Sequence, residues 1–389
     1  MSNSPILVDD KINIYNPAKL VFGNGCLENM IDDVTSMEDP RLFIVLSNSV
    51  KPNIDLVLEG LKEAKISFQI WTNIDKEPTI SMFEDTLQAA KEFKADTVLG
   101  IGGGSVLDTA KLVAALLQNE QNIRDVIGIG KLKKRNLYLV CVPTTAGTGS
   151  EVSPNSILLD ESENLKKGVL SPFLVPDASY IDPLLTKTVP PSITASTGLD
   201  ALTHCIEAYT NRFAHPMVDL YALEGIKLIG ANLEQAIKNG DDIKARSNVA
   251  LGSMYGGLCL GPVNTAAVHA LSYPLGSRYQ IAHGISNAIL LPYVMEFNLS
   301  AAPDRYARIA EALGVEGNRL GLDKAKQGIA KIRALINKSG SQSDLSSFNI
   351  PESDIEKMAE MAMTIDRLLK NNIREVTIKD AIAIYKAAY

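Results

Sequence analysis

The first half of the chain alternates between two hydrophobic patterns. Continuous apolar runs bounded by polar residues, which are typical of strands buried in a parallel sheet, occur at residues 42–46, 97–101 and 137–142. Stretches with apolar residues at helical spacing occur at residues 26–36, 54–64, 80–93 and 106–117. Shorter strand candidates lie at 20–22 and 68–71, and a hairpin is predicted at 156–160 and 167–170. This alternation predicts a doubly wound α/β unit.

The second half lacks the strand pattern. The segment Val189-Pro190-Pro191-Ser192 marks the change. Helical spacing then recurs at residues 193–210, 217–238, 242–260, 266–273, 284–297, 304–313, 323–339, 353–364 and 377–387. A chain of 389 residues is too long for one ordinary core. We therefore predict two domains, an α/β domain over residues 1–188 and an all-helical domain over residues 189–389.

Composition narrows the class of protein. The net charge is −7 with no block of basic residues, so we expect no nucleic-acid partner. No apolar run approaches the ~20 residues that span a bilayer, so we expect no membrane insertion. The first ten residues lack the basic start and apolar centre of a signal peptide. Four scattered cysteines form no CxxC pair and indicate reduced thiols, which points to the cytoplasm.

Two loops follow predicted strands and carry residues suited to a nucleotide. Gly102-Gly103-Gly104-Ser105 opens a helix, where backbone N–H groups can face a phosphate; the alternative is a plain strand-to-helix turn. Residues 143–150, Pro-Thr-Thr-Ala-Gly-Thr-Gly-Ser, form a hydroxyl-rich loop; the alternative is an ordinary polar loop. Ligands of α/β sheets bind at the carboxyl ends of strands, where both loops lie.

All four histidines of the chain fall between residues 204 and 283. Asp200 and His204 are four residues apart in a helical context, so they share one helix face. With His269 and His283 they would make a ligand set for zinc or ferrous iron, although sequence separation does not show that they meet. His215 has no assigned role and is expected at a helix start or on the surface.

These motifs together resemble the iron-dependent (group III) alcohol dehydrogenases, over essentially the whole chain. The matching segments are Phe22–Gly25, Gly102–Lys111, Pro143–Val152, Thr197–Glu207, His269–Gly276, His283–Ala288 and Arg374–Thr377. The resemblance implies a dehydroquinate synthase-like architecture with an N-terminal dinucleotide-binding domain and a C-terminal catalytic domain. It also implies a homodimer or a larger homo-oligomer.

The resemblance also assigns roles to residues. It implies that the metal ligands are Asp200, His204, His269 and His283. It implies that the cofactor pyrophosphate is held by Gly103, Gly104, Ser105 and Asp108. It implies that the rest of the cofactor site is lined by Thr144, Thr145 and Thr148, with Lys167 near it.

Two positions depart from the family pattern. Tyr273 stands where many members carry a histidine that assists the substrate; a phenol can hydrogen-bond a substrate but is a poor base near neutral pH. A purely structural role in the helix core is the alternative. Ser47 stands where NAD-specific members often carry an Asp that repels a 2′-phosphate. Together with Lys51, this leaves both NAD and NADP open.

The predicted function is therefore metal-dependent, NAD(P)-linked interconversion of a small alcohol or diol and its aldehyde or ketone, with Fe2+ or Zn2+. One alternative is a glycerol-dehydrogenase-like or synthase-like enzyme of the same architecture. Another is a non-catalytic nucleotide-binding protein, which a missing metal ligand would indicate; none of the four is missing.

Overall fold

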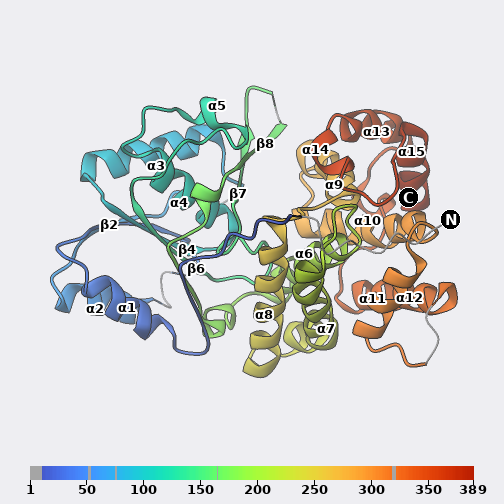
Figure 1. The fold of residues 1–389 in the computed structure, drawn as a ribbon, viewed down its shortest axis with the longest axis horizontal. Helices are drawn as coiled ribbons and strands as arrows, with labels where there is room; N and C mark the ends of the chain where they lie inside the picture. Colours follow the sequence, from blue (N-terminus) through green and yellow to red (C-terminus); the bar gives the residue numbers. More distant parts are fainter. Residues whose placement is uncertain (1–10, 51–53, 75–76, 164, 318–320) are drawn as a thin grey trace. The chain divides into compact units, whose positions relative to one another are not determined.

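The computed structural model describes residues 11–50, 54–74, 77–163, 165–317 and 321–389 (Figure 1). The first ten residues, on which the expectation about a leader depends, and Lys51 lie outside this part. The described chain forms two compact units. One is Tyr15–Val189, and the other is Pro190–Tyr389 with residues 11–14. Each is considered by itself.

The α/β unit is built on a six-stranded sheet in the order β1-β9-β6-β4-β2-β3. All its pairings are parallel, as the continuous apolar runs predicted. Its strands are β1 (Lys19–Phe22), β2 (Arg41–Leu46), β3 (Ser67–Trp71), β4 (Thr97–Gly102), β6 (Tyr138–Pro143) and β9 (Ala178–Ile181). Strands β2, β4 and β6 are buried almost throughout because helices cover both faces of the sheet.

Two separate cores form on the two faces of this sheet. One packs α1 (Leu27–Thr35) and α2 (Asp55–Glu63) on the strands, and the other packs α3 (Ile80–Phe93) and α4 (Gly104–Leu116) on them. Figure 1 shows these helix pairs on opposite sides of the sheet. The predicted doubly wound arrangement is confirmed.

The predicted hairpin is also present, as the antiparallel strands β7 (Asn155–Asp160) and β8 (Leu165–Leu170). The short β5 (Gly128–Ile129) pairs with β8, and α5 (Ile123–Val126) precedes it. The sequence did not predict α5, β5 or β9. Strand β9 has only four residues, too few for a recognisable pattern, and its place between β1 and β6 depends on long-range pairing.

The second unit is helical, as predicted. Its described residues form no β-strand. Its helices are α6 (Pro191–Tyr209), α7 (Pro216–Lys238), α8 (Ile243–Leu260), α9 (Ala267–Tyr279), α10 (His283–Asn298), α11 (Pro303–Ala312), α12 (Leu322–Lys338), α13 (Ile355–Met363), α14 (Asp366–Leu369) and α15 (Ile378–Ala387). The four-residue α14 was not predicted. No helix in the described chain is long and apolar enough to cross a membrane.

One predicted helix end was wrong. Residues 266–273 were expected to end at the residue before Pro274, but α9 continues through Pro274 to Tyr279. Proline inside a helix removes a hydrogen bond and costs about 3 kcal/mol. Pro274 and most of the neighbouring α9 side chains are buried, so packing in the helical unit outweighs that cost.

Candidate metal centre and cofactor loops

Helix α6 presents three polar side chains on one buried face. Asp200, His204 and Glu207 are spaced by four and three residues, so they lie one above another along the helix. All three are less than 6% exposed. Buried ionisable groups are costly unless they are paired, so this face marks a functional site rather than ordinary core.

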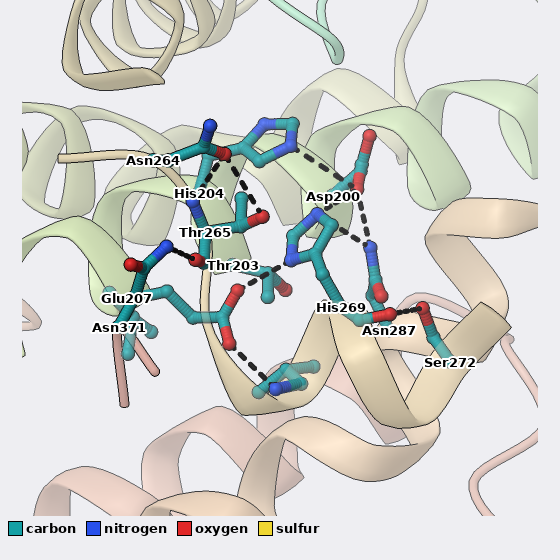
Figure 2. A network of polar contacts seen from close by, with 12 residues as sticks. Asp200, Thr203, His204, Glu207, Asn264, Thr265, His269, Ser272, Asn287 and Asn371 are labelled. Carbon is teal, nitrogen blue, oxygen red and sulfur yellow. Dashed lines mark hydrogen bonds and ion pairs between the residues drawn. The ribbon is translucent and has the colours of Figure 1, made fainter. Parts of the chain in front are cut away.

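The predicted metal ligands Asp200, His204 and His269 lie together on this face (Figure 2). His269 lies on α9, and His283 is the first residue of α10. The Nε2 atoms of His269 and His283 each lie 3.6 Å from Oδ1 of Asp200. The ligand atoms of these three residues all lie within 4.8 Å of one another.

His204 adjoins this group of three. Its Nε2 lies 3.9 Å from Oδ1 of Asp200, and its ring stacks on the ring of His269 with centroids 4.8 Å apart. The structure thus brings together all four residues that the sequence suggested.

A close approach of two helices brings His283 to the cluster. A Cβ atom on Gly284 would lie 2.0 Å from the backbone oxygen of Ser196 on α6. Only glycine at this position lets the start of α10 pack so tightly on α6, one turn before Asp200.

The geometry fits a divalent cation. Four ligands about 2.1 Å from a central ion lie about 3.4 Å from one another, close to the contacts of Asp200 with the three imidazoles. One carboxylate with three imidazoles suits zinc or ferrous iron in its chemistry. The side chain of His283 is 34% exposed, whereas those of Asp200 and His269 are 5% exposed, so the cluster opens on the His283 side.

Opposing effects set the protonation of the cluster. Burial opposes ionisation of Asp200, but the facing imidazoles outweigh it and hold the pKa of Asp200 well below its usual range. Burial likewise disfavours the imidazolium form of His269, but the carboxylates of Glu207 and Asp200 raise the pKa of His269 to about 10.

Glu207 is a functional residue that the sequence reasoning left without a role. Its Oε2 lies 2.5 Å from Nδ1 of His269, and its Oε1 accepts a hydrogen bond from the backbone N–H of Val268. A carboxylate on Nδ1 leaves Nε2 to face the cluster. The available sequence signal was the spacing of Glu207 from Asp200 and His204 on one helix face.

Asn287 is a second residue that was missed. Its Nδ2 lies 2.7 Å from Oδ1 of Asp200 and 3.1 Å from Nε2 of His269. Its Oδ1 is buried without a hydrogen-bond partner among the residues that the structure describes. Because buried amide oxygens rarely stay unpaired, this acceptor indicates that a group outside the chain completes the site.

Tyr273 lies on the open side of the cluster. Its ring centroid is 6.4 Å from that of His283, and its hydroxyl accepts a hydrogen bond of 2.8 Å from Arg367 on α14. The partly exposed side chain therefore borders the cluster. Arg367 was not identified from the sequence.

His215 lies outside the cluster. It is the N-cap of α7, where its Nδ1 accepts a hydrogen bond from the backbone N–H of Met217. The predicted helix start is correct, but the residue is buried and not on the surface.

In the α/β unit, the two predicted cofactor loops lie side by side. They follow β4 and β6, which are neighbours in the sheet, and the backbone N–H of Thr144 donates to the carbonyl of Gly102. A Cβ atom on Gly104 would lie 2.5 Å from Cγ2 of Thr148. A Cβ atom on Gly103 would lie 3.4 Å from Oγ1 of Thr145. The glycines thus let the threonine loop pack on the start of α4, where Ser105 stands in the first turn.

The sheet order makes this edge a ligand crevice. From β2 the chain proceeds to β3 at one side, whereas from β4 it proceeds to β6 at the other. Open α/β sheets bind ligands at such switch points. Ser47 follows β2 and donates its backbone N–H to Ile101 of β4, so it lies at this crevice. Its hydroxyl pairs with that of Ser49.

Both carboxylate oxygens of Asp108 accept hydrogen bonds from within the α/β unit. One carboxylate oxygen accepts a hydrogen bond from Oγ of Ser150, and the other accepts one from the backbone N–H of Ile157. The buried Lys111, one helical turn further on, donates to the carbonyls of Ser150 and Ser153. These contacts fasten the threonine loop to α4.

Lys167 is partly exposed on β8. Its Nζ forms an ion pair of 2.6 Å with Oε2 of Glu163. Within the described chain, Lys167 forms no hydrogen bond or ion pair with any of the other predicted cofactor residues.

Comparisons with known proteins agree with this fold and site. Residues 17–183 match the family described as iron-containing alcohol dehydrogenase, and residues 194–389 match the C-terminal region of the Fe-containing alcohol dehydrogenase family. Long-chain-alcohol dehydrogenase 1 of Geobacillus thermodenitrificans is 36% identical over 384 residues, covering 96% of this chain and 97% of the relative.

Solved structures give the same result. A crystal structure of 1,3-propanediol oxidoreductase matches with a TM-score of 0.94 and 32% identity, covering 98% of this chain and all of the other. Sulfoacetaldehyde reductase from Bifidobacterium kashiwanohense in complex with NAD+ matches with a TM-score of 0.88 and 25% identity, covering 97% and 99%. The fold and the site define an oxidoreductase of the two-domain, metal-dependent type. The chain belongs to the iron-containing alcohol dehydrogenase family, which confirms the predicted resemblance.

Proposed function

We propose that the chain catalyses reversible hydride transfer between an alcohol and a nicotinamide cofactor, with a divalent metal held by Asp200, His204, His269 and His283. The convergence of these four side chains on one buried face carries the proposal. A bound cation would act there as a Lewis acid on the oxygen of the substrate.

The residues around the cluster supply orientation. Glu207 fixes the ring of His269, and Asn287 holds the carboxylate of Asp200. Tyr273 borders the open side next to His283, where its hydroxyl can hydrogen-bond a substrate oxygen. Because a divalent charge stabilises negative charge on that oxygen, the reaction tolerates a phenol at the position where the family pattern led us to expect a histidine.

The cofactor is proposed to bind at the crevice of the α/β sheet. Gly103, Gly104 and Ser105 at the start of α4 can face the pyrophosphate with backbone N–H groups, with Asp108 behind them. The threonine loop, with Thr144, Thr145 and Thr148, lines the same edge. Lys167, which pairs with Glu163, is a further candidate. The NAD+ complex of a relative supports NAD. Ser47 at the crevice carries no negative charge to repel a 2′-phosphate, so the same site admits NADP.

The substrate is a small alcohol, diol or aldehyde. Relatives are named for long-chain alcohols, propanediol and sulfoacetaldehyde, so oxidation or reduction at a terminal carbon is the shared chemistry. We favour Fe2+ over Zn2+ because of the family to which the chain belongs.

We also propose a homo-oligomer in the cytoplasm. Met217 and Leu220, on one face of α7, are 52% and 74% exposed, and such apolar side chains suit an interface between subunits. The four cysteines are free and buried, which fits a reducing compartment. Light scattering of the purified protein tests whether it is an oligomer.

The experiment that tests the proposed reaction uses metal-depleted protein reloaded anaerobically with Fe2+ or Zn2+. Absorbance of the reduced nicotinamide is followed with NAD or NADP and a panel of short alcohols and aldehydes. We expect turnover that requires metal and is lost in His269→Ala. The matched control is His215→Ala, which removes the histidine outside the cluster. Metal-independent turnover, or none with any pair, would contradict the proposal.

A further inference from the structure

We propose that Arg367 binds an oxyanion group on the substrate, so that the preferred substrates are aldehydes and alcohols carrying a carboxylate or sulfonate at the far end of the chain. This inference rests on the proposed function and adds the substrate class. The observation behind it is the position of the Arg367 guanidinium next to Tyr273, which borders the open side of the metal cluster.

The position of Arg367 follows from two contacts. Its Nη2 donates a hydrogen bond of 2.8 Å to the hydroxyl of Tyr273, and its Cζ lies 5.8 Å from the centre of that ring. The same ring lies 6.4 Å from the ring of His283, the most exposed member of the cluster. Tyr273 therefore separates the guanidinium from the metal ligands by the width of one aromatic side chain.

Arg367 differs in its ion pairing from three other partly buried arginines of the helical unit. Arg278 pairs with Asp354, Arg305 with Asp219, and Arg333 with Glu296. Arg367 is partly buried, yet across the described ranges no carboxylate lies within ion-pair distance of it. The charge of Arg367 is therefore not neutralised by a carboxylate of the described chain and remains available to an anionic ligand.

The remaining donors suit an oxyanion. A guanidinium has five N–H donors in a planar fork, and the hydrogen bond to Tyr273 engages only one of them. The fork matches carboxylate and sulfonate oxygens in a bidentate manner. The tyrosine hydroxyl holds the group in place, so a substrate with its carbonyl at the metal cluster and an anion at its other end can bridge the two positions.

The test compares two series of straight-chain aldehydes, one ending in a carboxylate and one ending in a methyl group, on metal-loaded enzyme with the nicotinamide cofactor. In the wild type we expect at least one carboxylate-ended aldehyde to have a higher kcat/KM than the methyl-ended aldehyde of the same chain length. Arg367→Gln should lower that value by roughly ten- to a hundredfold, because hydrogen bonds between charged groups are lost, while the methyl series changes less than about threefold. Arg367→Lys should be intermediate, since it keeps the charge but loses the fork.

The matched control is Arg333→Gln. Arg333 also lies over a tyrosine ring, that of Tyr293, but pairs with Glu296 and, in the described part of the chain, has no contact with Tyr273. It should change neither series. Equal losses in both series for Arg367→Gln would show that the guanidinium only orients Tyr273, and would overturn the inference.

A binding measurement separates this inference from the proposed reaction. Succinate, glutarate and adipate are titrated calorimetrically into metal-loaded wild-type and Arg367→Gln protein. We expect at least one diacid to bind the wild type and to bind the variant about tenfold or more weakly. Binding that is absent, or equal in both proteins, overturns the inference, whereas turnover of the methyl series alone would still support the dehydrogenase activity.

Discussion

Nδ1 of His269 lies 2.5 Å from Oε2 of Glu207, and both side chains are buried. The contact joins α6 to the start of α9, and the backbone N–H of Val268 strengthens the junction by donating to the same carboxylate. The imidazole is thereby held with Nε2 directed at Asp200. The metal cluster thus depends on a carboxylate that is not one of its proposed ligands.

Glu207→Gln should weaken metal binding by about ten- to a hundredfold without loss of the fold, because the amide no longer supplies a negative charge to His269. Metal affinity is measured by competition with a chelator. Glu356→Gln, on the exposed face of α13, is the control. Equal affinity of wild type and Glu207→Gln would show that the contact does not support the metal.

Gly104→Ala should raise the KM for the cofactor by about tenfold or more with a smaller effect on kcat. The added Cβ would lie 2.5 Å from Cγ2 of Thr148, so the threonine loop has to move away from the start of α4. Thr148→Ser in the same chain removes that methyl group and should restore part of the affinity. Cofactor binding is followed by fluorescence titration. An unchanged KM in Gly104→Ala would contradict the proposed cofactor loop.

We expect the buried Glu151 to make the stability of the protein depend on pH. Burial raises the pKa of Glu151 to about 7, above the value of about 4.3 expected in the unfolded chain. Between these values the folded protein keeps a proton that the unfolded chain has released, so stability falls as pH rises from about 4 to about 7. Above that range the ionised group costs the fold about 4 kcal/mol.

Glu151→Gln should therefore raise the melting temperature more at pH 8 than at pH 5. Differential scanning calorimetry at the two pH values measures the difference. Glu360→Gln, on the exposed surface of α13, should show no such dependence. A gain that is the same at both pH values would mean that Glu151 is not protonated in the folded protein.

Tyr273→Phe should lower kcat/KM by about tenfold while metal content stays the same, because one hydrogen bond to the substrate is lost and the ring still packs beside His283. Steady-state kinetics and metal analysis of the same preparation give both values. Full activity of the variant would remove the hydroxyl from the mechanism and leave Tyr273 with a packing role.

Local patterns predicted most of the fold, and long-range contacts explain the errors. The buried runs at β2, β4 and β6 and the amphipathic α3 follow from residues close in sequence. Strand β9 depends on pairing with strands far away in the chain, and the passage of α9 through Pro274 depends on burial. Neither effect leaves a local signal.

The site shows the same division. Spacing on one helix suggested Asp200 and His204, and the small number of histidines suggested the other two ligands. Asn287 and Arg367 acquire their roles only through contacts with other helices, Asn287 with Asp200 on α6 and Arg367 with Tyr273 on α9. A short unpredicted helix, α14, carries Arg367, so no pattern in the sequence drew attention to it.

The metal centre is tested by the position of iron in crystals of the anaerobically loaded protein, measured as anomalous difference density at the iron absorption edge. We predict a single strong peak per chain, within coordination distance of Oδ1 of Asp200 and of Nε2 of His204, His269 and His283, which disappears in Asp200→Ala. A peak at other residues, or loaded iron that persists in Asp200→Ala, would contradict the proposed metal centre.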